Sequence, residues 1–187
     1  MAREARKGGG RSWSPWRIAG WSIPALLLLL PAVAMQFTSE VDWTASDFVF
    51  AGMLFGSVGL AFELIVRKSR SLAYRFGAGL AVVAAFLTVW VNGAVGMIGS
   101  EDNPYNLVFG GVLVVALVGA VLARFEASGM GRAMAVTAVA QAAAGAVGFA
   151  TDARGAALSM AFAGQWLLSA ASFRNAAREQ AAANGAN

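Results

Sequence analysis

The sequence contains no cysteine and no histidine among its 187 residues. The lack of cysteine excludes disulfides, thiolate nucleophiles and cysteine-ligated metals, and the lack of histidine excludes imidazole acid–base catalysis, histidine-ligated haem and the usual zinc sites. Charged residues are scarce as well, at 13% of the chain against 58% hydrophobic residues. The surface of a water-soluble domain needs about 25–35% charged residues. This composition therefore excludes a soluble fold and most known catalytic constellations.

Long apolar runs separate the few charged residues. A bilayer core about 30 Å thick requires about 20 residues of helix, because each backbone amide must find its partner within the segment. Six stretches meet this length and predict an all-α integral membrane protein, a six-helix transmembrane bundle. Residues 17–174 then form one membrane domain, between a basic cytoplasmic tail (1–16) and a flexible cytoplasmic tail (175–187). The predicted spans are residues 17–36, 47–66, 74–99, 105–124, 132–150 and 156–174.

The cationic residues indicate how the chain threads the membrane. With six spans, 13 of the 14 Lys and Arg residues fall on one side and only Arg154 on the other, where Asp and Glu collect. Short loops rich in Lys and Arg stay in the cytoplasm, so both termini are predicted to be cytoplasmic. The net charge of +4 then reflects contact with lipid headgroups, and no nucleic-acid partner is expected.

The first predicted span has a second interpretation. Its basic start, the apolar run 18–30 and the following Pro31-Ala32-Val33-Ala34 also have the outline of a cleaved signal peptide. Tryptophans at positions 13, 16 and 21 suit a retained helix at a membrane interface instead. Cleavage would leave five spans in the same orientation.

Short blocks recur along the predicted helices. Three inward-running spans open with a similar block: Phe50-Ala51-Gly52, Phe109-Gly110-Gly111 and Phe162-Ala163-Gly164. Two outward-running spans end with another: Gly93-Ala94-Val95-Gly96 and Gly145-Ala146-Val147-Gly148. This order predicts tandem helical hairpins, although a chain rich in Gly, Ala and Val also aligns in this way by chance. The small residues themselves predict close helix packing in lipid.

Polar side chains inside the spans are the candidates for a functional site, because burying them in a bilayer is costly. Asn92, Gln141 and Gln165 lie within spans, with Thr88 one turn from Asn92 and Trp166 beside Gln165. These side chains either hydrogen-bond helices together or line a polar site for a solute in the outer half of the bundle. The second interpretation predicts that the three amides converge.

Glu63 is the candidate ionisable residue inside the membrane. It precedes Arg67 by four residues, which is the favourable helical spacing for an ion pair. An interfacial ion pair and a proton or cation relay are both consistent with this position.

The loop after the third span carries Glu101, Asp102 and Asn103, followed by Pro104 and, two residues later, Asn106. Asn103 before Pro104 has the pattern of a helix cap, and the two acids suit the positive end of that helix. The same oxygens could coordinate a cation, although their spacing does not match an EF-hand. No cofactor is predicted.

The segment from Trp90 to Asn106, which includes Asn92-Gly93-Ala94-Val95-Gly96 and Asn103-Pro104-Tyr105-Asn106, resembles one found in small, functionally uncharacterised multi-pass membrane proteins of bacteria. The resemblance covers about residues 45–150. It implies a protein of the bacterial inner membrane and supplies no catalytic residue.

Two functions agree with these features. The first is a transport component for a small solute or ion, and in size and topology the bundle resembles the substrate-binding subunits of energy-coupling-factor vitamin transporters. No Gly-rich phosphate-binding loop with Lys-Ser/Thr is present, so another chain or an ion gradient would supply the energy. The second is a non-catalytic accessory or assembly subunit of a membrane complex. A homo-oligomer or a larger membrane complex is expected. An enzyme is not predicted, since a lipid-modifying activity would have to rely on carboxylates alone.

Overall fold

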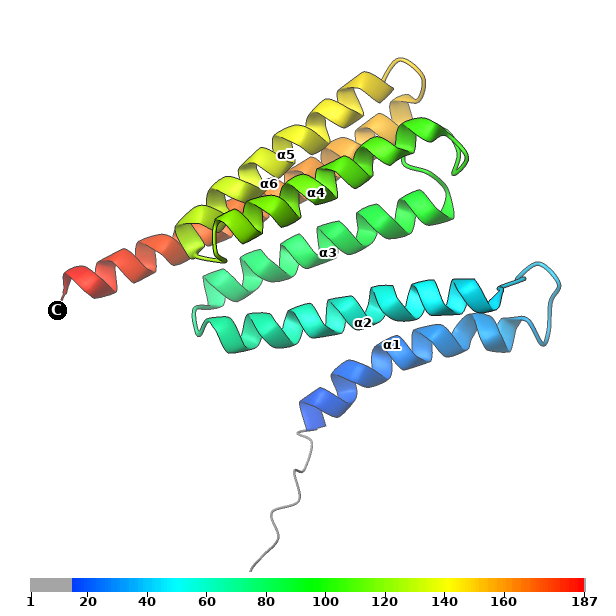
Figure 1. Cartoon of the computed structure of the whole chain (residues 1–187), viewed down its shortest axis with the longest axis horizontal. Coiled ribbons are helices and arrows are strands. Elements are labelled where there is room, and N and C mark those ends of the chain that lie inside the picture. The colour runs from blue at the N-terminus through cyan, green and yellow to red at the C-terminus, as the bar shows by residue number, and fades with distance from the viewer. Residues whose placement is uncertain (1–14, 187) are drawn as a thin grey trace, which may run out of the picture. The chain divides into compact units, whose positions relative to one another are not determined.

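The computed structural model describes residues 15–186, and within this range all regular secondary structure is helical. The all-α class and the six helices predicted from the sequence are confirmed. Residues 1–14 of the predicted basic tail lie outside the described range. The elements in chain order are α1 (Pro15–Ala34), α2 (Ala45–Lys68), α3 (Leu72–Ala94), the short 3-10 helix η1 (Pro104–Asn106), α4 (Leu107–Leu122), α5 (Ala127–Gly148) and α6 (Ala153–Gly185) (Figure 1).

The chain divides into two compact units, Met1–Gly59 and Leu60–Asn187, and α2 contributes to both. In the described part of the first unit, α1 and the first part of α2 run antiparallel. The two helices touch at two glycines of α2. A Cβ added at Gly59 would lie 3.0 Å from the Trp21 ring, and one added at Gly52 would lie 3.9 Å from the Leu28 side chain. Asp47 fixes the start of α2, because its carboxylate accepts a hydrogen bond from the Thr44 amide at 2.7 Å.

The second unit is built around a four-helix bundle of α3 to α6. Helix α6 packs against both α5 and α3, and α5 also packs against α4, so the spatial order is α3, α6, α5, α4. The main core contains Trp166 and Phe173 of α6 with Tyr74 of α3, Met130 and Met134 of α5 and small residues of the other three helices. A smaller core near the α3–α4 connection contains Met97, Ile98 and Phe109.

Small residues allow the helices of this bundle to approach closely. A Cβ at Gly145 would lie 2.7 Å from the Ser159 side chain, and one at Gly119 would lie 2.8 Å from the Cβ of Ala133. Backbones in such contact gain dispersion energy along their whole length, which is the main source of helix association in an apolar solvent. The predicted packing role of Gly and Ala therefore has a direct structural counterpart at α5–α6 and α4–α5.

Helix α3 ends earlier than the predicted span 74–99. The last helical residue is Ala94, and the chain then turns back through Gly96 (φ +76°) and Gly99 (φ +75°), conformations that glycine adopts without strain. The turn places Met97 and Ile98 in the interior, each 1% exposed. The apolar run predicted a longer helix because its residues are buried, but those after Ala94 are buried in a folded loop.

The structure also differs from the predicted flexible tail 175–187, because most of this segment is helical. Helix α6 continues to Gly185, and Ala176 within this extension is fully buried. Alanine has the highest helix propensity, and the sequence Ala181-Ala182-Ala183 offers no breaker before Asn184-Gly185. The polar composition indicated a solvated tail, whereas helix propensity decides its conformation.

The two Gly-Ala-Val-Gly blocks do not occupy equivalent positions, so this part of the tandem-hairpin interpretation gains no support. Gly145 and Gly148 lie inside α5 in close contact with other segments, whereas Gly93 has open space around it and Gly96 lies beyond the end of α3. Similar letters therefore serve helix packing in one place and a loop turn in the other.

Four helical segments are long and apolar enough to cross a membrane, by length and composition: Ala45–Lys68, Leu72–Ala94, Pro104–Leu122 and Ala153–Gly185. Helix α5 falls outside this group because Arg132, Gln141 and many Ala and Gly residues lower its hydropathy, and the described apolar part of α1 is Pro24–Ala34. The prediction of six spans is thus supported for four helices. Large apolar side chains are exposed along these segments, including Leu107 at 80% and Leu117 at 64%.

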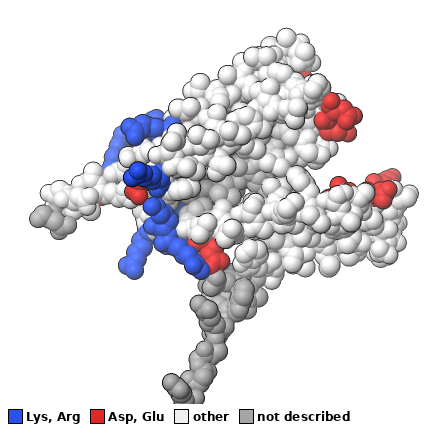
Figure 2. All heavy atoms as spheres, viewed as in Figure 1, with Lys and Arg blue, Asp and Glu red and all other residues white. Residues whose placement is uncertain are grey.

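Cationic residues of the second unit gather at one end of the bundle. Lys and Arg lie at the end where α3 and α5 begin, where Glu63 and Glu126 pair with Arg67 and Lys68, and the opposite end carries acidic side chains (Figure 2). The basic end contains Arg67, Lys68, Arg70, Arg75, Arg124, Arg132, Arg174 and Arg178. This is the separation on which the predicted orientation rests.

Candidate functional site

A buried polar pair joins α5 to α6. The Gln141 amide Nε2 donates to the Ser159 hydroxyl at 3.0 Å, and that hydroxyl donates to the backbone carbonyl of Gln141 at 3.0 Å. Both side chains are fully buried. The absence of a side chain at Gly145, one turn after Gln141, leaves the space that Ser159 fills. Sequence reasoning identified Gln141 but not Ser159, since a serine in a helix gives no distinctive signal.

Three buried polar atoms have no hydrogen-bond partner among residues 15–186: Gln141 Oε1, Asn92 Oδ1 and Trp166 Nε1. A buried donor or acceptor left without a partner costs about 1–3 kcal/mol. Gln141 and Trp166 are nearly inaccessible, at 0% and 1% exposure. Such atoms are the positions at which a small polar solute or a buried water would gain most from binding.

The predicted polar residues use their donors on separate helix contacts. Asn92 Nδ2 bonds the Thr88 carbonyl of its own helix at 2.7 Å, and the Thr88 hydroxyl bonds the Ala84 carbonyl. Gln165 Nε2 instead reaches the Leu80 carbonyl of α3 at 3.2 Å. In the described part of the chain, no hydrogen bond joins any two of the three amides. The expected convergence of Asn92, Gln141 and Gln165 is therefore not seen in their hydrogen bonds.

Trp166 belongs to the core of the bundle. It is one of the largest fully buried side chains and shares the main core with Met134 of α5 and Phe173 of α6. The sequence placed this ring beside a candidate polar site, and the structure buries it in the apolar core at 1% exposure.

The residues considered as cation ligands organise the loop between α3 and α4. Asn106 accepts from the Met97 and Ile98 amides through one oxygen and donates to the Ser100 carbonyl at 2.8 Å. Asn103 caps η1 by accepting from the Tyr105 amide, as predicted.

Glu101 and Asp102 are exposed. Among the described residues, no group of three or more Asp or Glu side chains is arranged to hold a metal ion. The amide oxygens considered as ligands are bonded to backbone groups, so the geometry gives Asn103 and Asn106 a role in folding the loop.

Asp152, which was not among the candidate site residues, connects this loop to the start of α6. Its carboxylate accepts from the amides of Gly155 and Arg154 at 3.0 Å and from the Gly99 amide at 2.9 Å. The hydrogen bond from Gly155, followed by the one from Gly99, lowers the pKa of Asp152. An aspartate directly before a helical segment is the signal that could have revealed it.

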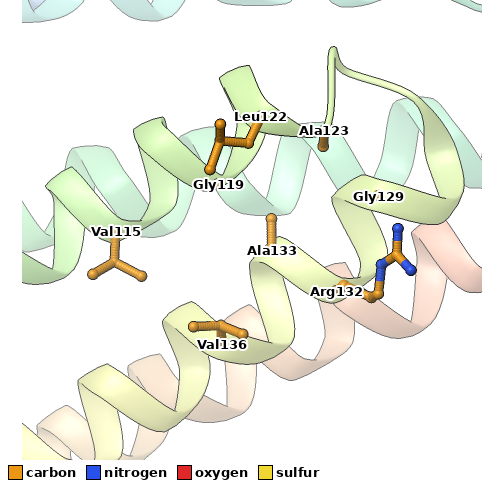
Figure 3. Close-up of a pocket in the computed structure, with 8 residues that line it drawn as sticks. All are labelled: Val115, Gly119, Leu122, Ala123, Gly129, Arg132, Ala133 and Val136. Carbon is orange, nitrogen blue, oxygen red and sulfur yellow. The ribbon is translucent and has the colours of Figure 1, made fainter.

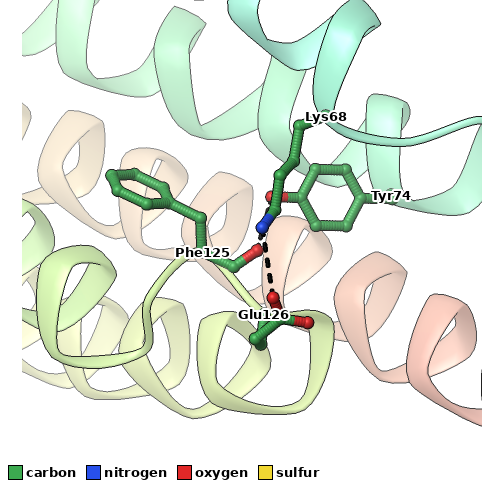
Figure 4. A network of polar contacts seen from close by, with 4 residues as sticks. All are labelled: Lys68, Tyr74, Phe125 and Glu126. Carbon is green, nitrogen blue, oxygen red and sulfur yellow. Dashed lines mark hydrogen bonds and ion pairs between the residues drawn. The ribbon is translucent and has the colours of Figure 1, made fainter.

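The opposite end of the bundle carries a different network, shown in Figure 4. Lys68 Nζ and Glu126 Oε1 are 3.1 Å apart, and the Tyr74 hydroxyl donates to the Phe125 carbonyl at 2.7 Å. The bond from Tyr74 to Phe125 holds the turn between α4 and α5. In this turn Arg124 and Phe125 take left-handed conformations (φ +50° and +57°), which are unfavourable for non-glycine residues. No local pattern in the sequence could have revealed contacts between segments more than 50 residues apart.

Glu63 forms an ion pair with Arg67 one turn later in α2, at 2.5 Å. The carboxylate is partly exposed, and the arginine is largely exposed. This geometry is that of a helical i, i+4 pair, and it favours the ion-pair interpretation over the relay.

Comparisons with known proteins add no assignment. No protein family model, no curated protein and no solved structure matches the chain. Function must therefore be argued from the geometry of the site itself.

Proposed function

We propose that the protein is an integral membrane protein of the bacterial inner membrane that acts as a non-catalytic accessory or assembly subunit of a membrane complex. Four helices of suitable length and hydropathy support membrane insertion. The resemblance of the segment from Trp90 to Asn106 to small bacterial membrane proteins supports the choice of membrane.

The single observation that carries the accessory role is how the predicted polar residues are used. The Gln141 side chain forms a hydrogen bond with α6 and the Gln165 side chain with α3, while Asn92 forms one within its own helix. Hydrogen bonds between helices specify how a bundle packs, which is the property that a scaffold subunit requires. The apolar side chains exposed along α2 and α4 provide surface for lipid or for further helices.

A second candidate function is a transport component for a small polar solute. The unpartnered Gln141 Oε1, 0% exposed within the bundle, is the observation that favours it. A solute with a hydrogen-bond donor would satisfy this oxygen, and the buried Trp166 Nε1 would supply a donor to the same class of compound.

Native mass spectrometry of the protein, extracted from its own membrane into nanodiscs, distinguishes these roles. The accessory role predicts a stoichiometric complex with other membrane chains that survives Gln141→Leu. The transport role predicts a bound small molecule that is lost in Gln141→Leu, with a folded monomer or homo-oligomer in both samples. Phe50→Leu, an exposed apolar change in another helix, is the control for nonspecific effects.

Membrane insertion is tested separately by alkaline extraction. An integral protein stays in the membrane pellet at high pH, whereas a peripheral one is released. Release of the chain would contradict both candidate functions.

A further inference from the structure

A groove of about 270 Å³ lies between α4 and α5, near the basic end of the bundle. Val115, Gly119, Leu122 and Ala123 line it from α4 and its C-terminal end, and Gly129, Arg132, Ala133 and Val136 line it from α5 (Figure 3). Seven of these eight residues are apolar or glycine, and the eighth is a cation.

The two chemical characters of the groove are separated along its length. Val115 and Val136 lie away from the α4–α5 connection, whereas Arg132 lies near it, one turn into α5 (Figure 3). A molecule that filled the groove would therefore place an apolar part along the helices and an anionic part beside the connection. A phospholipid in the leaflet at the basic end has this arrangement, with its acyl chain along the helices and its phosphate at the interface.

Arg132 is free to bind such an anion. It is exposed, and among residues 15–186 it forms no hydrogen bond or ion pair. The nearest carboxylate in the sequence, Glu126, is paired with Lys68. Glu126 also occupies the N-cap position of α5 without bonding an amide, so its side chain does not neutralise the positive start of that helix.

We propose that this groove binds an anionic phospholipid, with its phosphate at Arg132 and an acyl chain between Val115 and Val136. The proposal rests on the proposed membrane insertion, with the basic end of the bundle at the cytoplasmic leaflet. Basic pockets between helices on that side bind anionic headgroups, because the cytoplasmic leaflet is negatively charged and attracts cationic side chains.

The narrow middle of the groove favours an acyl chain over a partner helix as its occupant. The groove has about 270 Å³ and is narrowed where Gly119 packs onto Ala133. An acyl chain, which is much thinner than a helix, fits this space.

The charge of the site is tested with delipidated protein titrated with phosphatidylglycerol in a phosphatidylcholine background and read by native mass spectrometry. Replacing Arg132 by Gln is expected to weaken phosphatidylglycerol binding about fivefold, the effect of one basic residue at an anionic surface. Arg178→Gln, an exposed arginine on α6 outside the groove, is the matched control and should bind as the wild type does. Equal binding by the Arg132→Gln and wild-type proteins would overturn the proposal.

The acyl part is tested by filling the groove. Val136→Trp places a large ring among the lining residues and should reduce phosphatidylglycerol binding severalfold, whereas Val139→Trp, on the same helix outside the groove and 69% exposed, should not. The deacylated headgroup, glycerophosphoglycerol, should bind at least tenfold more weakly than the lipid. Headgroup binding equal to that of the lipid, or a dimer that Val136→Trp disrupts in place of a bound lipid, would contradict the assignment.

Failure of this proposal is distinguishable from failure of the proposed function. Release of the chain by alkaline extraction would rule out both the membrane role and the lipid site. A chain that stays in the membrane but binds phosphatidylglycerol no better than phosphatidylcholine would rule out the lipid site alone.

Discussion

The chain between α3 and α4 folds into one end of the bundle, whereas the connection between α4 and α5 at the other end stays on its surface. At the acidic end, Asn106 and Asp152 bond backbone amides, and Met97 and Ile98 are buried beneath them. At the basic end, Lys68 pairs with Glu126 while both side chains are 44% and 64% exposed.

The difference shows which interactions hold each end. The hydrogen bonds from the buried Met97 and Ile98 amides to Asn106 cannot be replaced by water, so losing them is expensive. Ion pairs between exposed side chains compete with solvent and salt and contribute little. We therefore expect the acidic end to be a rigid cap and the basic end to be adaptable, which agrees with a surface that binds lipid or partner chains.

Replacing Asn106 by Ala is the largest test of the rigid cap. The change leaves the buried amides of Met97 and Ile98 without an acceptor, and each such group costs about 1–3 kcal/mol. We expect a loss of about 3 kcal/mol in the free energy of unfolding, measured by SDS titration with circular dichroism in detergent. Asn92→Ala is the control: it removes one bond within α3 and an oxygen without a partner in the described chain, so it should cost less than about 1 kcal/mol.

Gly155→Ala tests the contact between the cap and α6. A methyl group there would collide with the backbone carbonyl of Met97 and approach the Asp152 carboxylate to 2.7 Å. We expect a cost of about 2 kcal/mol, typical of an overpacked site. Gly164→Ala is the same substitution in the same helix, in open space. It should stabilise the protein slightly through helix propensity, and an equal loss in both variants would contradict the docked loop.

The helices were largely predictable from the sequence, because apolar length and charge spacing act locally. The errors lie at helix ends. The predicted span 74–99 ignored the glycines at positions 96 and 99, whose left-handed conformations end the apolar run as a buried loop. The tail after residue 174 was judged by polarity, although its alanines favour helix.

The candidate site was predictable as a set of residues but not as an arrangement. Gln141 and Gln165 stand out because amides are rare in apolar spans, yet their partners, Ser159 and the Leu80 carbonyl, follow from how the helices pack. The groove beside Arg132 involves two helices whose relative placement depends on glycine contacts, which no local pattern encodes. Asp152 could have been recognised as a helix cap, but its bond to Gly99 could not.

The pH dependence of stability provides a smaller test of the acidic end. Hydrogen bonds from the Gly155 and Gly99 amides lower the pKa of Asp152 in the folded protein. Their stabilisation is therefore complete above the ordinary value of about 3.9 and is lost as the pH falls through the lowered pKa. We expect the melting temperature in detergent to fall as the pH drops below about 3.9, and Asp152→Asn to reduce that fall. Asp102→Asn, at an exposed site in the same end of the bundle, should keep it; identical acid profiles for all three proteins would exclude the role of Asp152.

The smallest expected effect belongs to the Lys68–Glu126 pair at the basic end. Both groups are more than 40% exposed, so the coupling energy in a double-mutant cycle of Lys68→Ala and Glu126→Ala should be about 0.5 kcal/mol or less. Because exposed charges are screened within a Debye length of about 10 Å at 0.1 M salt, the coupling should vanish near 1 M sodium chloride. The Tyr74→Phe variant removes the neutral bond to the Phe125 carbonyl, and its cost should not change with salt. A coupling above 2 kcal/mol that persists at high salt would mean that the basic end is as rigid as the acidic cap, and the contrast between the two ends would be wrong.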